Sequence, residues 1–133
     1  MKAKRFFSVS FDSRNDPAIR YLRVACGGIK AYGQWIGLLA MLYDEPPKEI
    51  DQTPISYIDL TDATAAQVVC QELDFDDLDE LKRFASVCVD KDLLSRRAFE
   101  EHGWLMSEGV NEQLAYQRKC EIAGKKGAKK RWE

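Results

Sequence analysis

The chain contains 133 residues, of which 45% are hydrophobic and 32% are charged. This length and balance suit one domain that buries its own core, and they exclude a collagen-like, low-complexity or wholly disordered chain. The longest apolar stretch, residues 36–43, is far shorter than the roughly 20 residues that span a bilayer, so no membrane partner is expected. The first residues are basic but lack the apolar core of a signal peptide, which predicts a cytoplasmic protein.

Charge is distributed unevenly along the chain. Residues 118–133 carry a net charge of +5 and the preceding residues a net charge of −7, which together give the overall −2. A basic tail on an acidic body is typical of a tail that binds an anion, most often nucleic acid. The alternative is a solvated, frayed C-terminus, and charge alone does not separate the two.

The four cysteines are spread evenly along the chain and never form a close pair, so they lack the spacing of a zinc or redox motif. A domain of this size does not need disulfides, and no secretion signal is present. We therefore expect reduced cysteines that act as small core residues, namely Cys26, Cys70, Cys88 and Cys120.

The first half of the chain predicts an extended arm and two helices. Residues 6–11 alternate as a strand does, with aromatic residues on one side. Asp16 suits an N-cap and Pro17 the first position of a helix, which the pair Gly27-Gly28 ends. The next helix, residues 29–43, is the central core helix because it carries a wide apolar stripe of Ile29, Tyr32, Trp35, Ile36, Leu39, Leu42 and Tyr43.

Glycines within this second helix predict a close neighbour. Gly33 and Gly37 lie four residues apart, and glycine inside a helix costs about 1 kcal/mol relative to alanine. Another element is therefore expected to approach closely there. Residues 44–56, with three prolines, are predicted to form a loop, and residues 57–60 a short strand.

Two further helices are predicted. Thr61 or Asp62 caps a helix to about Glu72, and a tight turn at residues 74–76 leads into a helix ending near Val89. Acidic residues crowd the first turns of the latter helix, where the helix dipole favours them. Leu93-Leu94 and residues 103–106 then suggest two short strands around an excursion, and Ser107 caps a last helix.

The C-terminal residues have lost apolar periodicity. We expect residues 1–123 to form the domain and residues 124–133 a basic tail or the start of a linker. The element order of helix, strand, helix, turn, helix, strand, excursion and strand is that of a winged helix-turn-helix. The predicted fold class is therefore mainly α with a small β-hairpin or wing.

Four stretches resemble one protein family. They are residues 28–42 (GIKAYGQWIGLLAML), 87–94 (VCVDKDLL), 99–107 (FEEHGWLMS) and 124–132 (GKKGAKKRW). In this order they resemble the N-terminal domains of phage replisome organisers, relatives of the DnaD-like primosomal proteins. The resemblance implies a winged-helix domain that serves replication initiation, contacts DNA or other replisome proteins, and often self-associates.

Candidate DNA contacts lie in two places. The tail offers Lys125, Lys126, Lys129, Lys130 and Arg131 for phosphate contacts, with Trp132 able to stack on a base. Arg96 and Arg97 lie where a wing would reach the DNA backbone or minor groove, although Glu100 and Glu101 could simply pair with them. The acidic helix that ends near Val89 corresponds to the helix that enters the major groove in the winged-helix group. It departs from that pattern, because its carboxylates would repel phosphate oxygens.

No pattern for catalysis or for a cofactor is found. His102 is the lone histidine and is expected in an exposed turn, and no cysteine or serine lies in a nucleophile motif. Asp76, Asp77, Asp79 and Glu80 lack the spacing of a calcium loop. The expected function is non-catalytic DNA binding in replication initiation. The alternatives are a protein-interaction or oligomerisation module of the replisome, docked through the acidic helix and residues 6–11, and a transcriptional regulator on the same fold.

Overall fold

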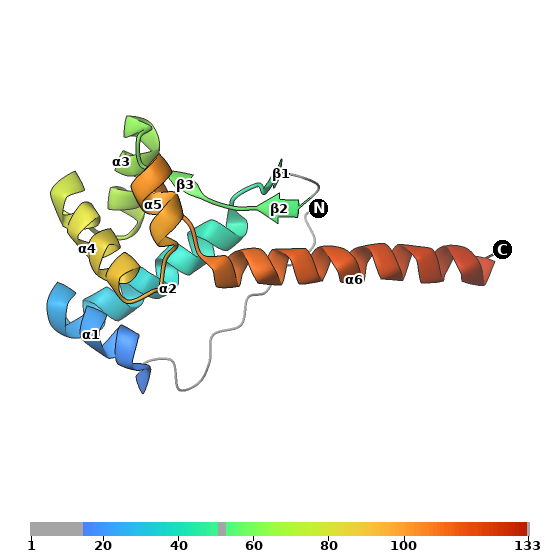
Figure 1. Cartoon of the computed structure of the whole chain (residues 1–133), viewed down its shortest axis with the longest axis horizontal. Helices are drawn as coiled ribbons and strands as arrows, with labels where there is room; N and C mark the ends of the chain where they lie inside the picture. The colour runs from blue at the N-terminus through green and yellow to red at the C-terminus, as the bar shows by residue number, and fades with distance from the viewer. Residues whose placement is uncertain (1–14, 51–52, 133) are drawn as a thin grey trace.

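The computed structural model describes residues 15–50 and 53–132, with side chains described as far as Gly124. Its elements in chain order are α1 (Pro17–Cys26), α2 (Ile29–Asp44), β1 (Lys48–Ile50), β2 (Thr53–Ile55), β3 (Ile58–Asp59), α3 (Ala63–Glu72), α4 (Leu78–Asp90), α5 (Arg96–His102), β4 (Trp104–Leu105) and α6 (Glu108–Trp132). Helices pack around α2, and α6 extends away from them (Figure 1). The fold is mainly helical, as predicted. The predicted arm at residues 6–11 lies outside the described residues.

Helix α1 begins and ends as its sequence predicts. The Asp16 carboxylate accepts a hydrogen bond from the Ala18 amide at 2.8 Å, and Pro17 occupies the first turn. Gly27 then adopts a φ of 106°, a left-handed conformation that glycine tolerates without steric cost. The chain turns at once into α2, against which α1 packs.

Helix α2 is the central helix, and most of its predicted stripe packs in the core. Tyr32, Ile36 and Leu39 are partly buried there. The buried residues are Ala31, Gln34, Trp35, Leu38, Leu42 and Tyr43, whereas Ile29 is 70% exposed. The buried side also includes Ala31, Gln34 and Leu38, which the predicted stripe left out. Helix α2 is apolar around most of its circumference, so the neighbouring elements determine which residues are fully buried. Of the two glycines, Gly37 has the expected close neighbour, since an added Cβ would lie 2.6 Å from Leu73 Cδ2. A Cβ at Gly33 would meet no atom within 4 Å.

The predicted loop over residues 44–56 contains a β-hairpin. Strands β1 and β2 pair antiparallel, with Glu49 opposite Pro54. The hairpin was missed because Pro54 argues against a strand, yet proline is tolerated in a short strand at a sheet edge. After the hairpin, Ser56 is held by two long-range hydrogen bonds: its hydroxyl donates to the Leu42 carbonyl, and its amide donates to Asn111 Oδ1 at 2.9 Å.

Helices α3 and α4 begin at side-chain caps. Asp62 accepts a hydrogen bond from the Thr64 amide at 3.0 Å, and Asp77 accepts one from the Glu80 amide at 2.8 Å. Between the helices, Asp74 takes a φ of 56°, which aspartate adopts more readily than most residues. Both helices lie within two residues of their predicted starts and ends.

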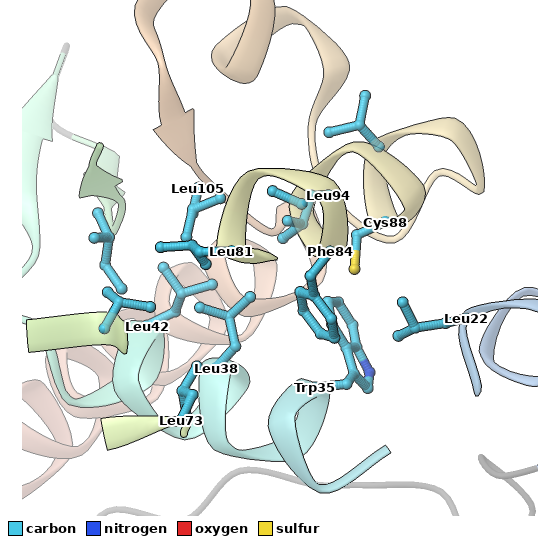
Figure 2. Packing of buried hydrophobic residues seen from close by; sticks show 14 of the residues in the cluster. Leu22, Trp35, Leu38, Leu42, Leu73, Leu81, Phe84, Cys88, Leu94 and Leu105 are labelled. Carbon is cyan, nitrogen blue, oxygen red and sulfur yellow. The ribbon is translucent and has the colours of Figure 1, made fainter. Parts of the chain in front are cut away.

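The core joins α1, α2 and α4 with the turn that follows α3. Figure 2 shows Phe84 of α4 pointing toward Trp35 of α2, with Leu22 of α1 close to them. Phe84 also packs edge-on against Phe75, with ring centroids 5.1 Å apart. The core therefore orients α4 relative to α2, and α6 also packs on α2.

The predicted pair of strands around an excursion is only half correct. Leu93-Leu94 form no strand, and the excursion between them and β4 is the helix α5. Helix α5 forms because Ser95 caps it and Gly103 ends it with a φ of 71°. The strand β4 pairs antiparallel with β3, where Ile58 lies opposite Leu105. A single hydrogen bond of 2.8 Å from the Ser95 amide to the Met106 carbonyl links the segment before α5 to the residue that follows β4.

Across the described ranges, no helix is both long enough and apolar enough to span a membrane.

Candidate nucleic-acid interface

The basic residues of the C-terminus lie on a helix, where sequence reasoning predicted a tail or linker. Ser107 caps α6, because its hydroxyl accepts a hydrogen bond from the Val110 amide at 3.3 Å. Val110 and Leu114 anchor the helix in the core. Beyond them the helix continues to Trp132 and projects from the bundle (Figure 1). Alanine, lysine and arginine rank high in helix propensity, which favours the continuation of α6 past Gly124.

The helix register groups these basic positions. Positions 125 and 126 are each followed by a basic position four residues later, at 129 and 130, which places the four positions on one side of a helix. Lys119, which is exposed, precedes position 126 by seven residues and therefore lies on the same side. Sequence reasoning left Lys119 out of the site, and extending the helical register back from Lys126 would have found it.

Arg118 does not belong to this group. Its guanidinium forms an ion pair with the carboxylate of Glu49 on β1. That contact ties the root of the projecting helix to the β1–β2 hairpin. The free basic stretch of α6 therefore begins at Lys119.

Arg96 and Arg97 lie on α5 and not on a wing. Arg96 forms ion pairs with Glu100 at 3.3 Å and with Asp90 at 3.6 Å, and Arg97 pairs with Glu101 at 3.2 Å. These pairs are exposed, so each contributes little to stability, but they balance the arginine charges locally. The alternative weighed from the sequence, simple pairing with the neighbouring glutamates, is what the structure shows.

Helix α4 presents a mixed face to solvent. Lys82, Arg83 and Ser86 are exposed in the middle of the helix, while Asp79 and Asp90 are exposed near its ends. Helix α1 packs along it, and Lys91, just after α4, lies over the Tyr21 ring at 4.1 Å. A major groove would bring phosphates close to both acidic ends, which disfavours base readout by α4.

An aromatic stack that the sequence did not predict lies where the hairpin, β4 and α5 meet. Trp104 stacks on Tyr57 with centroids 3.9 Å apart and on His102 with centroids 4.2 Å apart. The Lys48 Nζ lies 4.1 Å from the centroid of the Tyr57 ring and donates a hydrogen bond of 2.8 Å to the Tyr57 hydroxyl. These residues come from segments far apart in sequence, so no local pattern could have revealed the stack. The predicted exposed position of His102 is correct, and its ring is a packing partner.

The cysteines differ strongly in environment. Cys88 is buried, and burial raises the pKa of its thiol far above the ordinary value. Burial also raises the pKa of Cys70, with a further contribution from the nearby Asp77 carboxylate. Cys120 on α6 is exposed, which corrects the prediction that all four are core residues.

These environments predict selective thiol modification. Because the thiolate is the reacting form, Cys120 is expected to react with a thiol reagent in the folded protein, and Cys88 to react only at the rate of unfolding. Mass spectrometry of the protein after timed labelling at neutral pH measures both rates. Labelling in urea is the control, since all four thiols should then react alike. Equal rates for Cys88 and Cys120 in the folded protein would contradict the packing around α4.

The acidic residues at the start of α4 serve the helix itself. Asp77 caps it, and Glu80 accepts a hydrogen bond of 2.9 Å from the Asp76 amide. Within residues 15–50 and 53–132, no group of three histidine, cysteine, aspartate or glutamate side chains is placed to hold a metal ion.

The chain was compared with protein-family models, with curated proteins and with solved structures, and none of these comparisons found a match.

Proposed function

We propose that this chain is a non-catalytic DNA-binding domain of a phage or mobile-element replication initiation protein, which holds DNA through the basic side of α6. One observation carries the proposal. Helix α6 leaves the core after Leu114 and places Lys119 and four further lysine positions on one side of a projecting helix. A projecting helix with clustered lysines, on a domain that is otherwise acidic, can lie against a phosphate backbone.

A winged-helix architecture is part of the proposal. The order α2, β3, α3, α4 and β4, with β3 antiparallel to β4, follows the winged-helix order of helix, strand, helix, helix and strand. Helix α5 stands where a β-wing would be. The resemblance of residues 28–42, 87–94 and 99–107 to replisome organisers supports the same architecture.

The contacts we propose position the chain on DNA without reading its sequence. Lysines bind phosphates as mobile point charges, and such contacts supply affinity and salt dependence. Arg96 and Arg97 remain secondary candidates, because a phosphate would have to compete with their glutamate partners. A transcriptional regulator would need α4 to read bases, and the exposed Asp79 and Asp90 disfavour that role.

A protein-interaction module of the replisome is the second candidate function. A groove between α3 and the start of α4, with an apolar floor and an acidic rim, favours it. Replisome proteins or another copy of this chain would be the partners. The residues that line the groove belong to α3 and the start of α4, and the far end of α6 points away from these helices (Figure 1).

Fluorescence anisotropy with single- and double-stranded DNA at two or more salt concentrations tests DNA binding. The intact chain is expected to bind both, with affinity that falls steeply as salt rises. Replacing Lys125, Lys126, Lys129 and Lys130 with glutamine should reduce the slope of log affinity against log salt by about 3 to 4, because each lost phosphate contact accounts for about 0.7–0.9.

The matched control neutralises four exposed charges elsewhere on the described surface. Lys30, Lys82, Arg83 and Lys91 replaced with glutamine change the net charge equally but lie outside α6. This control should keep most of the salt slope. If both variants lose the slope equally, net charge and not α6 governs binding. If the intact chain binds neither DNA form near physiological salt, the proposal fails.

A further inference from the structure

A groove runs between α3 and the beginning of α4. Its volume is about 410 Å³, and its floor is built from Ala66, Cys70, Phe75 and Leu78. Leu78 is among the exposed large hydrophobic residues, so apolar surface extends to the mouth of the groove. This volume and apolar floor suit the burial of one large side chain and the segment that carries it.

The rim of the groove is acidic. Asp76 and Asp77 line it, and Asp79 follows in the exposed first turn of α4. The Asp77 carboxylate is engaged as the helix cap, whereas the Asp76 carboxylate makes no hydrogen bond or ion pair with any described residue. A concave, low-dielectric surface concentrates the field of such charges. The occupant that fits combines several cations with a large apolar side chain.

Among the described residues, one segment has that composition. Residues 125–132 contain four lysines, one arginine and a terminal Trp132. The other described residues are acidic in sum, so this segment is the described part of the chain that the groove would attract electrostatically.

The segment is too far away to enter the groove of its own molecule. The last residue of α6 buried in the core is Leu114, and α6 carries Lys125 about 16 Å and Trp132 about 27 Å farther along the helix axis. Helix α6 packs on α2 and β2, and its far end points away from α3 and α4 (Figure 1). The groove can therefore receive this segment only from a second copy.

We infer that residues 125–132 of one copy bind in the α3–α4 groove of another, with Trp132 on the apolar floor and lysines beside Asp76. The self-association does not depend on the proposed DNA binding. Where DNA is bound by the same lysines, the two interactions compete. Copies joined through their grooves then release their C-terminal segments to DNA, and DNA separates the copies.

Sedimentation equilibrium of the full chain over a concentration series tests the inference. The average mass should rise above the 15.2 kDa of one chain as concentration increases, and should fall again at high salt. Asp76→Lys should raise the dissociation constant at least about tenfold, since it places like charges together. Asp44→Lys makes the same charge change at an exposed position at the end of α2, outside the groove, and should associate as the unmodified chain does.

Mixing two variants keeps the test independent of folding defects. A chain in which Lys125, Lys126, Lys129 and Lys130 are all glutamate should remain monomeric, as should Asp76→Lys. Mixed together, the acidic segment of the first should bind the basic groove of the second and restore a complex. A monomeric unmodified chain at all concentrations, unchanged association of Asp76→Lys, or no complex in the mixture would each overturn the inference.

DNA titrations separate this inference from the proposed function. At concentrations where the chain self-associates, Asp76→Lys should bind DNA at least about twofold more tightly than Asp44→Lys, because its C-terminal segment is free. Self-association without DNA binding would leave the groove assignment standing and refute the proposed function. DNA binding by a chain that stays monomeric would support the proposed function and refute the groove assignment.

Discussion

Replacing Phe84 with alanine is expected to lower the free energy of unfolding by about 3–5 kcal/mol, the cost typical of removing a buried aromatic ring. Phe84 is 1% exposed and lies between α4 and the central helix α2, where its ring points toward Trp35 (Figure 2). The alanine variant also loses the edge contact between the rings of Phe84 and Phe75. Because a domain of this size has about 5–15 kcal/mol of stability in total, the variant should unfold at much lower urea concentration.

Urea denaturation followed by circular dichroism measures this effect. Tyr116→Ala provides the control, since it also removes an aromatic ring but from a position that is 70% exposed on α6. Its free energy of unfolding should change by less than about 0.5 kcal/mol. Similar losses in the two variants would mean that Phe84 is not in the core.

Gln34→Met is expected to cost about 1–3 kcal/mol of stability, because it keeps an unbranched side chain of similar size but removes the amide donor. Gln34 is 5% exposed, and its Nε2 donates a hydrogen bond of 2.8 Å to the Leu73 carbonyl. A second contact of 3.5 Å reaches the carbonyl of Asp74, whose backbone is left-handed. The amide therefore fixes the turn between α3 and α4 to the central helix.

The same urea experiment distinguishes this role from simple packing. Gln34→Glu should be more destabilising than Gln34→Met, because it buries a carboxylate against carbonyl oxygens. Gln67→Met is the control, since Gln67 is exposed on α3 and its change should be close to neutral. If Gln34→Met is as stable as the unmodified chain, the hydrogen bond to Leu73 contributes nothing.

The further consequence of the Gln34 contact concerns the groove. Phe75 follows the turn that Gln34 holds and forms part of the groove floor. Loss of the Gln34 amide should therefore weaken self-association as well as stability. The hydrogen bond links the packing of the core to the surface that we assign to a second copy.

Local sequence determined where most helices begin and end. Asp16, Asp62 and Ser107 cap helices at their predicted positions, and Gly27 ends α1. These features depend on contacts within a few residues, so a single sequence contains the information needed to place them. The charge difference between the body and residues 118–133 is likewise a property of the sequence alone.

Tertiary structure decided how those elements face one another. The buried side of α2 follows from the elements that pack on it, among them α1 and α6, and the apolar pattern of α2 does not encode their positions. Strand β3 pairs with β4 although three helices separate them in the sequence. The stack of Tyr57 on Trp104 depends on that pairing. The groove is lined by residues of α3, of the turn after it and of the start of α4, and Gln34 holds that turn from a distant helix. Caps and charges act over a few residues, whereas faces, pairings and cavities require contacts between distant segments.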